Sequence, residues 1–178
     1  MDPVKKPPNT ISLVGMPGAG KSTVGVLLAK LTGLQFRDTD LDIQVFAGAT
    51  LQQIIEAQGH IKLRQIEQQV LMDIPLDHSV ISTGGSVVYS EQAMQRLASS
   101  GPIVYLEADL PTLELRVAAA PLRGIASGNH QSFADIFHER TPLYRHYANH
   151  TVSSTDGTAD EVAANILQSL QQRPAPSA

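Results

Sequence analysis

Gly15-Met16-Pro17-Gly18-Ala19-Gly20-Lys21-Ser22-Thr23 is the stretch of sequence that decides the fold. It fits the pattern G-x-x-x-x-G-K-[ST], a glycine-rich loop that cradles phosphate groups. An apolar run at 11–14 precedes it and predicts a buried strand that starts near Thr10. The segment 21–31 follows with apolar residues at helical spacing, and Gly33 is a plausible end for that helix. The alternative is a glycine-rich turn before an ordinary helix, but the strand–loop–helix context favours a phosphate loop.

Each part of this loop has a chemical reason. Glycines let consecutive backbone N–H groups turn toward phosphate oxygens, and the helix N-terminus adds the positive end of its dipole. Lys21 would reach the β- and γ-phosphates as a catalytic group, and the Ser22 hydroxyl would be a ligand of Mg²⁺. The nucleotide site predicted from the loop comprises Gly15, Gly18, Ala19, Gly20, Lys21, Ser22 and Thr23.

The rest of the chain alternates between strand and helix patterns. Apolar runs predict strands at 34–38, 79–83, 103–106 and 151–153, and helical periodicity predicts helices at 40–46, 51–57, 62–73, 110–120, 132–147 and 158–170. Gly48 and Gly59 separate the second, third and fourth helices. This alternation predicts an α/β fold with a central parallel sheet flanked by helices. Breakers at 121–131 predict a mobile loop, which we expect to be part of a lid over about 118–130.

Length and composition indicate one domain. The chain has 178 residues, of which 42% are hydrophobic, and this supports one core with little room for a second. We therefore expect a single domain over 1–178, with flexible ends at 1–9 and 173–178. The sequence contains no Cys, which excludes disulfides, thiolate metal sites and Cys nucleophiles.

Charge and aromatic content argue against several classes of partner. A net charge of −4, the lack of Trp and an aromatic content of 4% do not fit a nucleic-acid binder. The sequence has neither an apolar export segment near its start nor a run of 18 apolar residues. We expect a cytoplasmic protein that does not enter a membrane, and we expect it to be a monomer. Because no N-K-x-D-type sequence is present to read guanine, a small ATP-dependent kinase is the natural candidate.

Four further motifs, in order along the chain, resemble those of the shikimate kinases. Asp38-Thr39-Asp40 resembles the family's D-T-D, and Gly59 with Leu63-Arg64 and Glu67 is similar to its G-E-x-x-F-R-x-x-E. Thr83-Gly84-Gly85-Ser86 resembles T-G-G-G, and Arg140-Thr141-Pro142-Leu143-Tyr144 is similar to R-x-P-L-Y. The similarity covers residues 11 to about 152 and implies a P-loop fold with a core of the nucleotide-monophosphate-kinase type and a lid.

The resemblance also implies an activity and a set of roles. The activity is transfer of the ATP γ-phosphoryl group to a hydroxyl of a small hydroxy carboxylic acid, with shikimate the best single guess and aromatic amino acid biosynthesis the pathway. By position, Asp38 would help hold Mg²⁺, and Asp40 would bind substrate hydroxyls and act as a catalytic group. Arg64 and Arg140 would clamp the substrate carboxylate. The remaining roles are those of Gly84 and Gly85, which would line the substrate site, and of Arg116, which would lie against the adenine.

Simpler interpretations exist for most of these residues. Asp38 could simply be the N-terminal cap of the next helix, or Asp40 could be that cap instead. Arg64 could form an exposed ion pair with Glu67, three residues later. Arg140 and Arg116 could each be a solvent-facing helix residue.

The sequence departs from the family pattern at three places. The family's lid carries Arg-Pro-Leu, whereas this chain has Ala120-Pro121-Leu122, so Arg123 becomes the catalytic candidate for stabilising transferring charge. Ser86 replaces the third glycine, and His60 replaces the Glu that follows Gly59. These departures leave open a kinase of a different hydroxy acid or polyol, a ligand-sensing domain with little activity, or, less favoured by the paired arginines, a nucleotide kinase.

Overall fold

The protein is described by a computed structural model, which covers residues 8–120, 125, 128 and 130–172. The strands are β1 (Thr10–Val14), β2 (Gln35–Asp38), β3 (Ser79–Ser82), β4 (Ile103–Glu107) and β5 (His150–Ser153). The helices are α1 (Lys21–Thr32), α2 (Thr39–Ala47), α3 (Leu51–Asp73), α4 (Glu91–Ser100), α5 (Leu110–Ala119), α6 (Phe133–Tyr147) and α7 (Ala159–Gln171), with a 3₁₀ helix, η1, at Val87–Tyr89.

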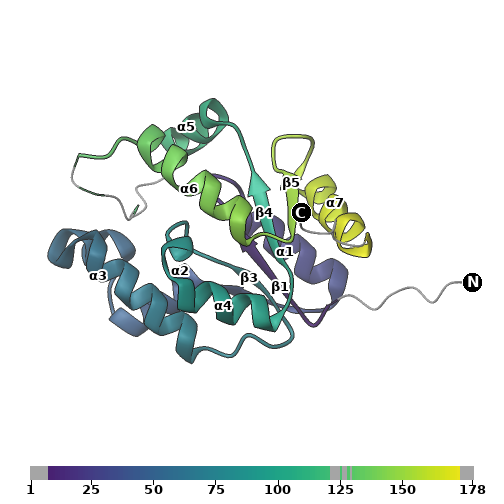
Figure 1. Cartoon of the computed structure of the whole chain (residues 1–178), viewed down its shortest axis with the longest axis horizontal. Helices are drawn as coiled ribbons and strands as arrows, with labels where there is room; N and C mark the ends of the chain where they lie inside the picture. The colour runs from purple at the N-terminus through teal and green to yellow at the C-terminus, as the bar shows by residue number, and fades with distance from the viewer. Residues whose placement is uncertain (1–7, 121–124, 126–127, 129, 173–178) are drawn as a thin grey trace, which may run out of the picture.

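The strands form one parallel sheet in the order β2-β3-β1-β4-β5. Strand β1 lies at the centre and is buried along its whole length. Helices α1 and α7 pack together on one side of the sheet, and α4 and α6 lie on the other (Figure 1). The predicted α/β fold with a parallel sheet flanked by helices is therefore confirmed.

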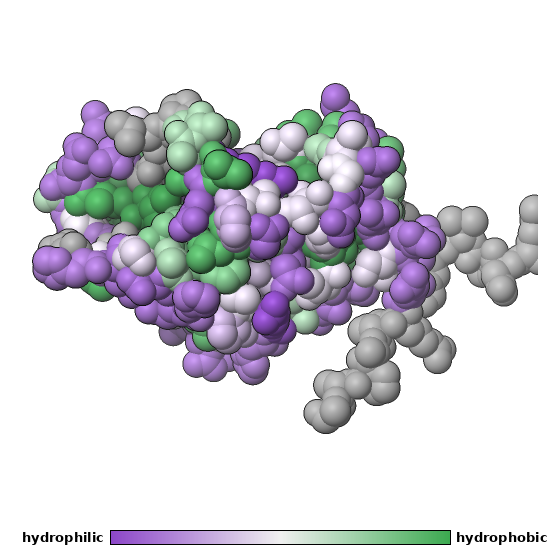
Figure 2. Space-filling view, turned by 90° about the horizontal axis from the view of Figure 1, so that it is seen from above, coloured by the Kyte–Doolittle hydropathy of each residue, from purple (hydrophilic) through white to green (hydrophobic). Residues whose placement is uncertain are grey.

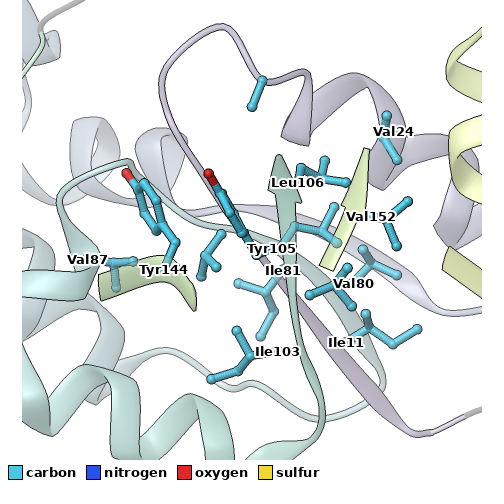
Figure 3. Packing of buried hydrophobic residues seen from close by; sticks show 14 of the residues in the cluster. Ile11, Val24, Val80, Ile81, Val87, Ile103, Tyr105, Leu106, Tyr144 and Val152 are labelled. Atoms are coloured by element: carbon cyan, nitrogen blue, oxygen red, sulfur yellow. The ribbon is translucent and has the colours of Figure 1, made fainter. Parts of the chain in front are cut away.

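Two hydrophobic clusters hold these layers together. The larger one surrounds the sheet and includes Tyr105 of β4 and Tyr144 of α6, whose rings stack with centroids 5.2 Å apart (Figure 3). The smaller one joins α2 to α3 through Ile43, Ile54 and Leu63, with Ile66 and Val70 completing it. The second cluster fixes the α2–α3 unit at the edge of the main core, beside β2.

The predicted elements agree with the observed ones within one or two residues at their ends, with three exceptions. The segments 51–57 and 62–73 are not separated by a loop, because α3 continues through them with a kink at Gly59, where φ is 81° and ψ is 168°. Helix α4 and η1 were not given bounds by the sequence. The predicted lid and flexible ends lie mostly outside the described residues. No helix in the described part of the chain is long and apolar enough to cross a membrane.

Candidate active site

The phosphate loop connects the end of the central strand to the start of α1, as predicted. Gly15, Gly18 and Gly20 have φ values of 151°, 86° and 89°, a region that side chains other than glycine rarely adopt. Lys21 bends back across the loop, and its Nζ donates hydrogen bonds to the Gly15 and Met16 carbonyls at 2.8 and 3.0 Å. Burial lowers the pKa of Lys21 to about 8. The carbonyls thus hold the ammonium at the loop, where an anionic phosphate would be a stronger partner.

Ser22 connects the loop to the neighbouring strands. Its Oγ donates to Asp38 Oδ2 at 2.6 Å and lies 3.2 Å from Ser82 Oγ. Asp38 also caps α2, since its Oδ1 accepts from the Asp40 N–H at 3.0 Å. The interpretation of Asp38 as a helix cap is therefore right, and the interpretation of Asp40 as that cap is wrong.

The oxygens at this point fit a magnesium ion. Hydroxyl and carboxylate oxygens are the ligands that Mg²⁺ prefers, and it is commonly held by one or two protein groups together with substrate phosphates and water. Ser22 and Asp38 provide that set beside the phosphate loop. Among the described residues no cluster of three His, Cys, Asp or Glu side chains is placed to hold a metal by itself.

Two carboxylates meet beside the glycine turn after β3. A Cβ atom on Gly84 would lie 2.2 Å from Glu67 Oε1 and 3.1 Å from Asp40 Oδ1, so any other residue there would displace the Glu67 carboxylate. Glu67 is buried, and its Oε2 accepts a hydrogen bond from Ser86 Oγ, while its Oε1 has no hydrogen-bond partner in the described structure. Burial, helped by repulsion from Asp40, raises the pKa of Glu67 to about 7 despite the Ser86 hydrogen bond.

Arg140 lies on the opposite side of the same turn. It is 1% exposed, so its interpretation as a solvated helix residue is wrong. A Cβ on Gly85 would lie 3.0 Å from its Nη1, which brings the guanidinium against the backbone of the turn. Tyr144, one helical turn further along α6, donates to the Gly85 carbonyl at 2.5 Å, and burial raises the pKa of its hydroxyl. Arg140 is thus a fixed cation close to the buried carboxylate of Glu67 and the half-buried carboxylate of Asp40.

One cleft of about 720 Å³ connects the phosphate loop to these charged groups. Its walls carry most of the predicted site: Gly18, Ala19, Gly20, Lys21, Ser22, Thr23, Asp40, Gly84, Gly85, Arg116 and Arg140. Apolar residues of α2 and α3 also line it, and hydrophobic side chains gather in a hollow at the end of the molecule where α3 begins (Figure 2). A cleft with mainly apolar walls and a few convergent polar groups is typical of a small-molecule site.

Arg116 lies at the rim of the cleft. Its two terminal nitrogens donate to the Gly18 carbonyl at 3.2 Å and to the Ser154 carbonyl at 3.1 Å. The side chain is exposed, but it bridges the phosphate loop and the segment after β5. This places it beside the nucleotide end of the cleft, so it is more than a solvent-facing helix residue.

Arg64 is placed differently from the other predicted residues. It does not line the main cleft but a neighbouring pocket of about 220 Å³, which shares Glu67 and Ser86 with it. Its guanidinium carbon lies 3.8 Å from the centre of the Tyr89 ring. Because Glu67 is buried, the alternative of an exposed Arg64–Glu67 ion pair is wrong. Arg123 lies outside the described residues.

Sequence reasoning assigned no role to Glu67 or Tyr89. The signal for Glu67 was its spacing of three residues from Arg64, which brings both to one side of a helix, but that spacing equally suggests a surface pair. Tyr89 follows the glycine turn in a short 3₁₀ helix, and no sequence pattern connects it to the arginines of α3 and α6.

Comparisons of the sequence and of the structure with known proteins all match shikimate kinases. The family model described as shikimate kinase matches residues 17–171. The chain is 34% identical over 160 residues to a shikimate kinase of Thermobifida fusca, covering 89% of this chain and 92% of that one. The structure of shikimate kinase from Acinetobacter baumannii in complex with shikimate superposes with a TM-score of 0.83 at 33% identity, covering 92% of this chain and 93% of that one. The enzyme from Aquifex aeolicus gives a TM-score of 0.77 at 31% identity, covering 90% and 95%. The chain therefore belongs to the shikimate kinase family, a family of small-molecule kinases, as its motifs had indicated.

Proposed function

We propose that this protein transfers the γ-phosphoryl group of ATP to a hydroxyl of shikimate. The observation that carries the proposal is that one cleft holds a phosphate loop together with Asp40, the buried Glu67 and the buried Arg140. A nucleotide needs the phosphate loop, and a hydroxy acid needs the carboxylates and the arginine. Membership of the family and the complex of the Acinetobacter baumannii relative with shikimate support the choice of acceptor.

The nucleotide end holds the triphosphate and its charge. Backbone N–H groups from Gly18 to Ser22 would surround the phosphates, and Lys21 would exchange its two carbonyl partners for β- and γ-phosphate oxygens. Arg116, which already contacts the Gly18 carbonyl, would lie beside the base.

Ser22 and Asp38 would hold Mg²⁺ at this end. When bound, the ion neutralises charge that develops on the phosphates.

The acceptor end orients the hydroxyl and the acid group. Asp40 would accept a hydrogen bond from the reacting hydroxyl and take its proton as the oxygen bonds to the γ-phosphorus, while the bond from phosphorus to the bridging oxygen of ADP breaks. Arg140, with Arg64, would bind the carboxylate, because the planar guanidinium matches a carboxylate with two parallel hydrogen bonds. The backbone at Gly84 and Gly85 would form the wall between the two sites. Arg123 stays a sequence-based prediction for charge stabilisation.

A second acceptor is a different hydroxy acid or a polyol, and the Ser86 hydroxyl in the wall of the cleft is the feature that favours it. ADP release, measured with ATP, Mg²⁺ and a panel of acceptors, distinguishes the two. The panel contains shikimate, a second cyclic hydroxy acid, an open-chain sugar acid and an uncharged polyol. We expect shikimate to give the highest kcat/KM. Higher kcat/KM with another acceptor would replace shikimate as the substrate, and nucleotide binding without turnover of any acceptor would favour a ligand-sensing role.

A further inference from the structure

Tyr89 is the last residue of η1 and lies where three helices meet. The 3₁₀ helix packs against α3, α4 and α6, and it follows directly after the glycine turn that lines the cleft. The Tyr89 side chain is half-buried. It lines the neighbouring pocket of about 220 Å³ together with Arg64, beside the Glu67 and Ser86 that this pocket shares with the cleft.

Tyr89 contacts one arginine with its ring and another with its hydroxyl. The guanidinium carbon of Arg64 lies over its ring at 3.8 Å, within the range of a cation–π interaction. The Nε of Arg140 donates to its hydroxyl oxygen at 3.3 Å, and the Arg140 guanidinium carbon is 5.3 Å from the ring centre. One aromatic side chain thus contacts both of the arginines that the proposed function assigns to the substrate carboxylate.

The Tyr89 hydroxyl has a fixed orientation. Its proton is donated to Glu139 Oε1, so an oxygen lone pair is left to accept from Arg140. Glu139 is held from its other oxygen, because Oε2 accepts from Gln131 Nε2 at 2.9 Å. The hydroxyl therefore acts as an acceptor toward the arginine and does not compete for the carboxylate.

Arg64 depends on this contact more than Arg140 does. Its Nε atom is buried and has no hydrogen-bond partner among the described residues, so its guanidinium is held by the ring of Tyr89 and by the charges of Glu67 and Glu139. Arg140 is also fixed by its burial and by the glycine turn. Two guanidinium groups repel one another, and one tyrosine that contacts both offers each a favourable partner without adding charge.

We propose that Tyr89 is a positioning residue for the acid group of the acceptor, holding Arg64 with its ring and Arg140 with its hydroxyl. This inference rests on the proposed function, because it takes shikimate as the acid that the two arginines bind. Its consequence is specific. Loss of Tyr89 should weaken recognition of a carboxylate and leave recognition of ATP unchanged.

The test compares Tyr89→Leu, Tyr89→Phe and the wild type with two acceptors, shikimate and its uncharged methyl ester. Tyr89→Leu removes both contacts, and we expect the KM for shikimate to rise roughly tenfold, from the size of a hydrogen bond to a charged group and a cation–π contact. Tyr89→Phe keeps the ring, so its KM should rise about threefold. The KM for ATP should stay within about twofold of the wild type in both variants, and so should the KM for the methyl ester. Tyr147→Leu removes an aromatic side chain at the end of α6, the helix that carries Arg140, without touching either arginine contact of Tyr89; it is the matched control and should change none of these constants.

A purely structural role for Tyr89 would raise the KM for the acid and for the ester equally, and that result would overturn the inference. An unchanged KM for shikimate in Tyr89→Leu would also overturn it while leaving the proposed function intact. Should Tyr89→Leu fail to fold, the near-isosteric Tyr89→Phe provides the test: a rise in the KM for shikimate but not for the ester supports the inference, and an equal change in both overturns it. A wild-type protein that turns over other acceptors but not shikimate would instead refute the proposed function, and this inference with it.

Discussion

Asp40 lies where the two halves of the cleft meet, with its carboxylate near Gly84 and on the lysine side of the turn. Asp40→Asn keeps the size of the side chain and removes its charge, so the acceptor hydroxyl loses its base. We expect kcat to fall by about 10²-fold or more, in line with the usual contribution of a general base. The affinity for ATP, measured by titration calorimetry, should change by less than about threefold. Lost ATP affinity with unchanged acceptor kinetics would place Asp40 in the metal site.

Glu67 gives the protein a stability that depends on pH. Its pKa is raised from 4.5 to about 7 in the folded state, so the folded state holds the proton more tightly than the unfolded chain. The stability contributed by this proton is present below pH 4.5 and is lost as the pH rises to 7. Glu67→Gln removes this loss and keeps an acceptor for Ser86. We expect the variant to unfold with a free energy higher than that of the wild type by about 3 kcal/mol at pH 8, and by less than about 1 kcal/mol at pH 5.

Urea unfolding without ligand, at both pH values, measures this difference. Lys21, whose folded-state pKa of about 8 leaves it about half protonated at pH 8, is present in both proteins, so its own contribution is common to them and is removed when the two free energies are subtracted. Glu114→Gln, on the exposed side of α5, is the control and should show no such dependence on pH. Equal gains at pH 5 and pH 8 for Glu67→Gln would mean that packing, and not ionisation, is responsible.

At the scale of single residues, the sequence identified the phosphate loop because its chemistry is local. Gly18, Gly20 and Lys21 act through backbone conformation and short reach, both of which a contiguous motif encodes. The roles of Glu67 and Tyr89 depend on contacts between segments 19 and 50 residues apart, to Ser86 and Glu139 respectively. No periodicity in one sequence reports such contacts.

The kink in α3 is the feature of an element that most directly shapes the site. Gly59 separates the N-terminal half of α3 from the half that carries Arg64 and Glu67, and both halves contribute to the cluster with Ile43 of α2. Nothing lies within 4 Å of a Cβ built on Gly59, so a side chain there would be strained by the backbone and not by a clash. A φ of 81° with a ψ of 168° is accessible almost only to glycine.

Gly59→Ala should therefore destabilise the protein by about 2 kcal/mol in urea unfolding. Gly48→Ala is a matched control, since Gly48 also has open space around its Cβ position but lies in the ordinary left-handed region, with φ 63° and ψ 24°. That control should cost about 1 kcal/mol. Equal losses in the two variants would show that the extended conformation at Gly59 carries no special strain.

Hydrophobic periodicity predicted where the elements lie, and Gly59 was correctly predicted to interrupt the helical pattern of α3. The sequence did not show that the break is a kink inside one helix, because a glycine with open surroundings permits either a loop or a kink. Helix α4 carried no chemical motif that would have given its bounds.

At the scale of the whole molecule, the cleft results from the sheet. In the order β2-β3-β1-β4-β5 the carboxyl ends of β2, β3 and β1 are neighbours, so Asp38, the glycine turn after Ser82 and the phosphate loop meet at one edge. The alternation of strands and helices predicted a parallel sheet, but the order of the strands depends on long-range pairing that local sequence does not specify. The observed order turns three separate motifs into one site.

Product formation tests the central claim, that one cleft brings the ATP γ-phosphate to a hydroxyl of shikimate. The protein is incubated with ATP, Mg²⁺ and shikimate, and phosphorylated shikimate and ADP are quantified by mass spectrometry, with Lys21→Ala as the paired variant. We expect one phosphorylated shikimate for each ADP from the wild type. We expect at least about a 10²-fold slower rate from Lys21→Ala, whose lysine no longer meets the phosphates. ADP without phosphorylated shikimate, or an unchanged rate in Lys21→Ala, would contradict the account.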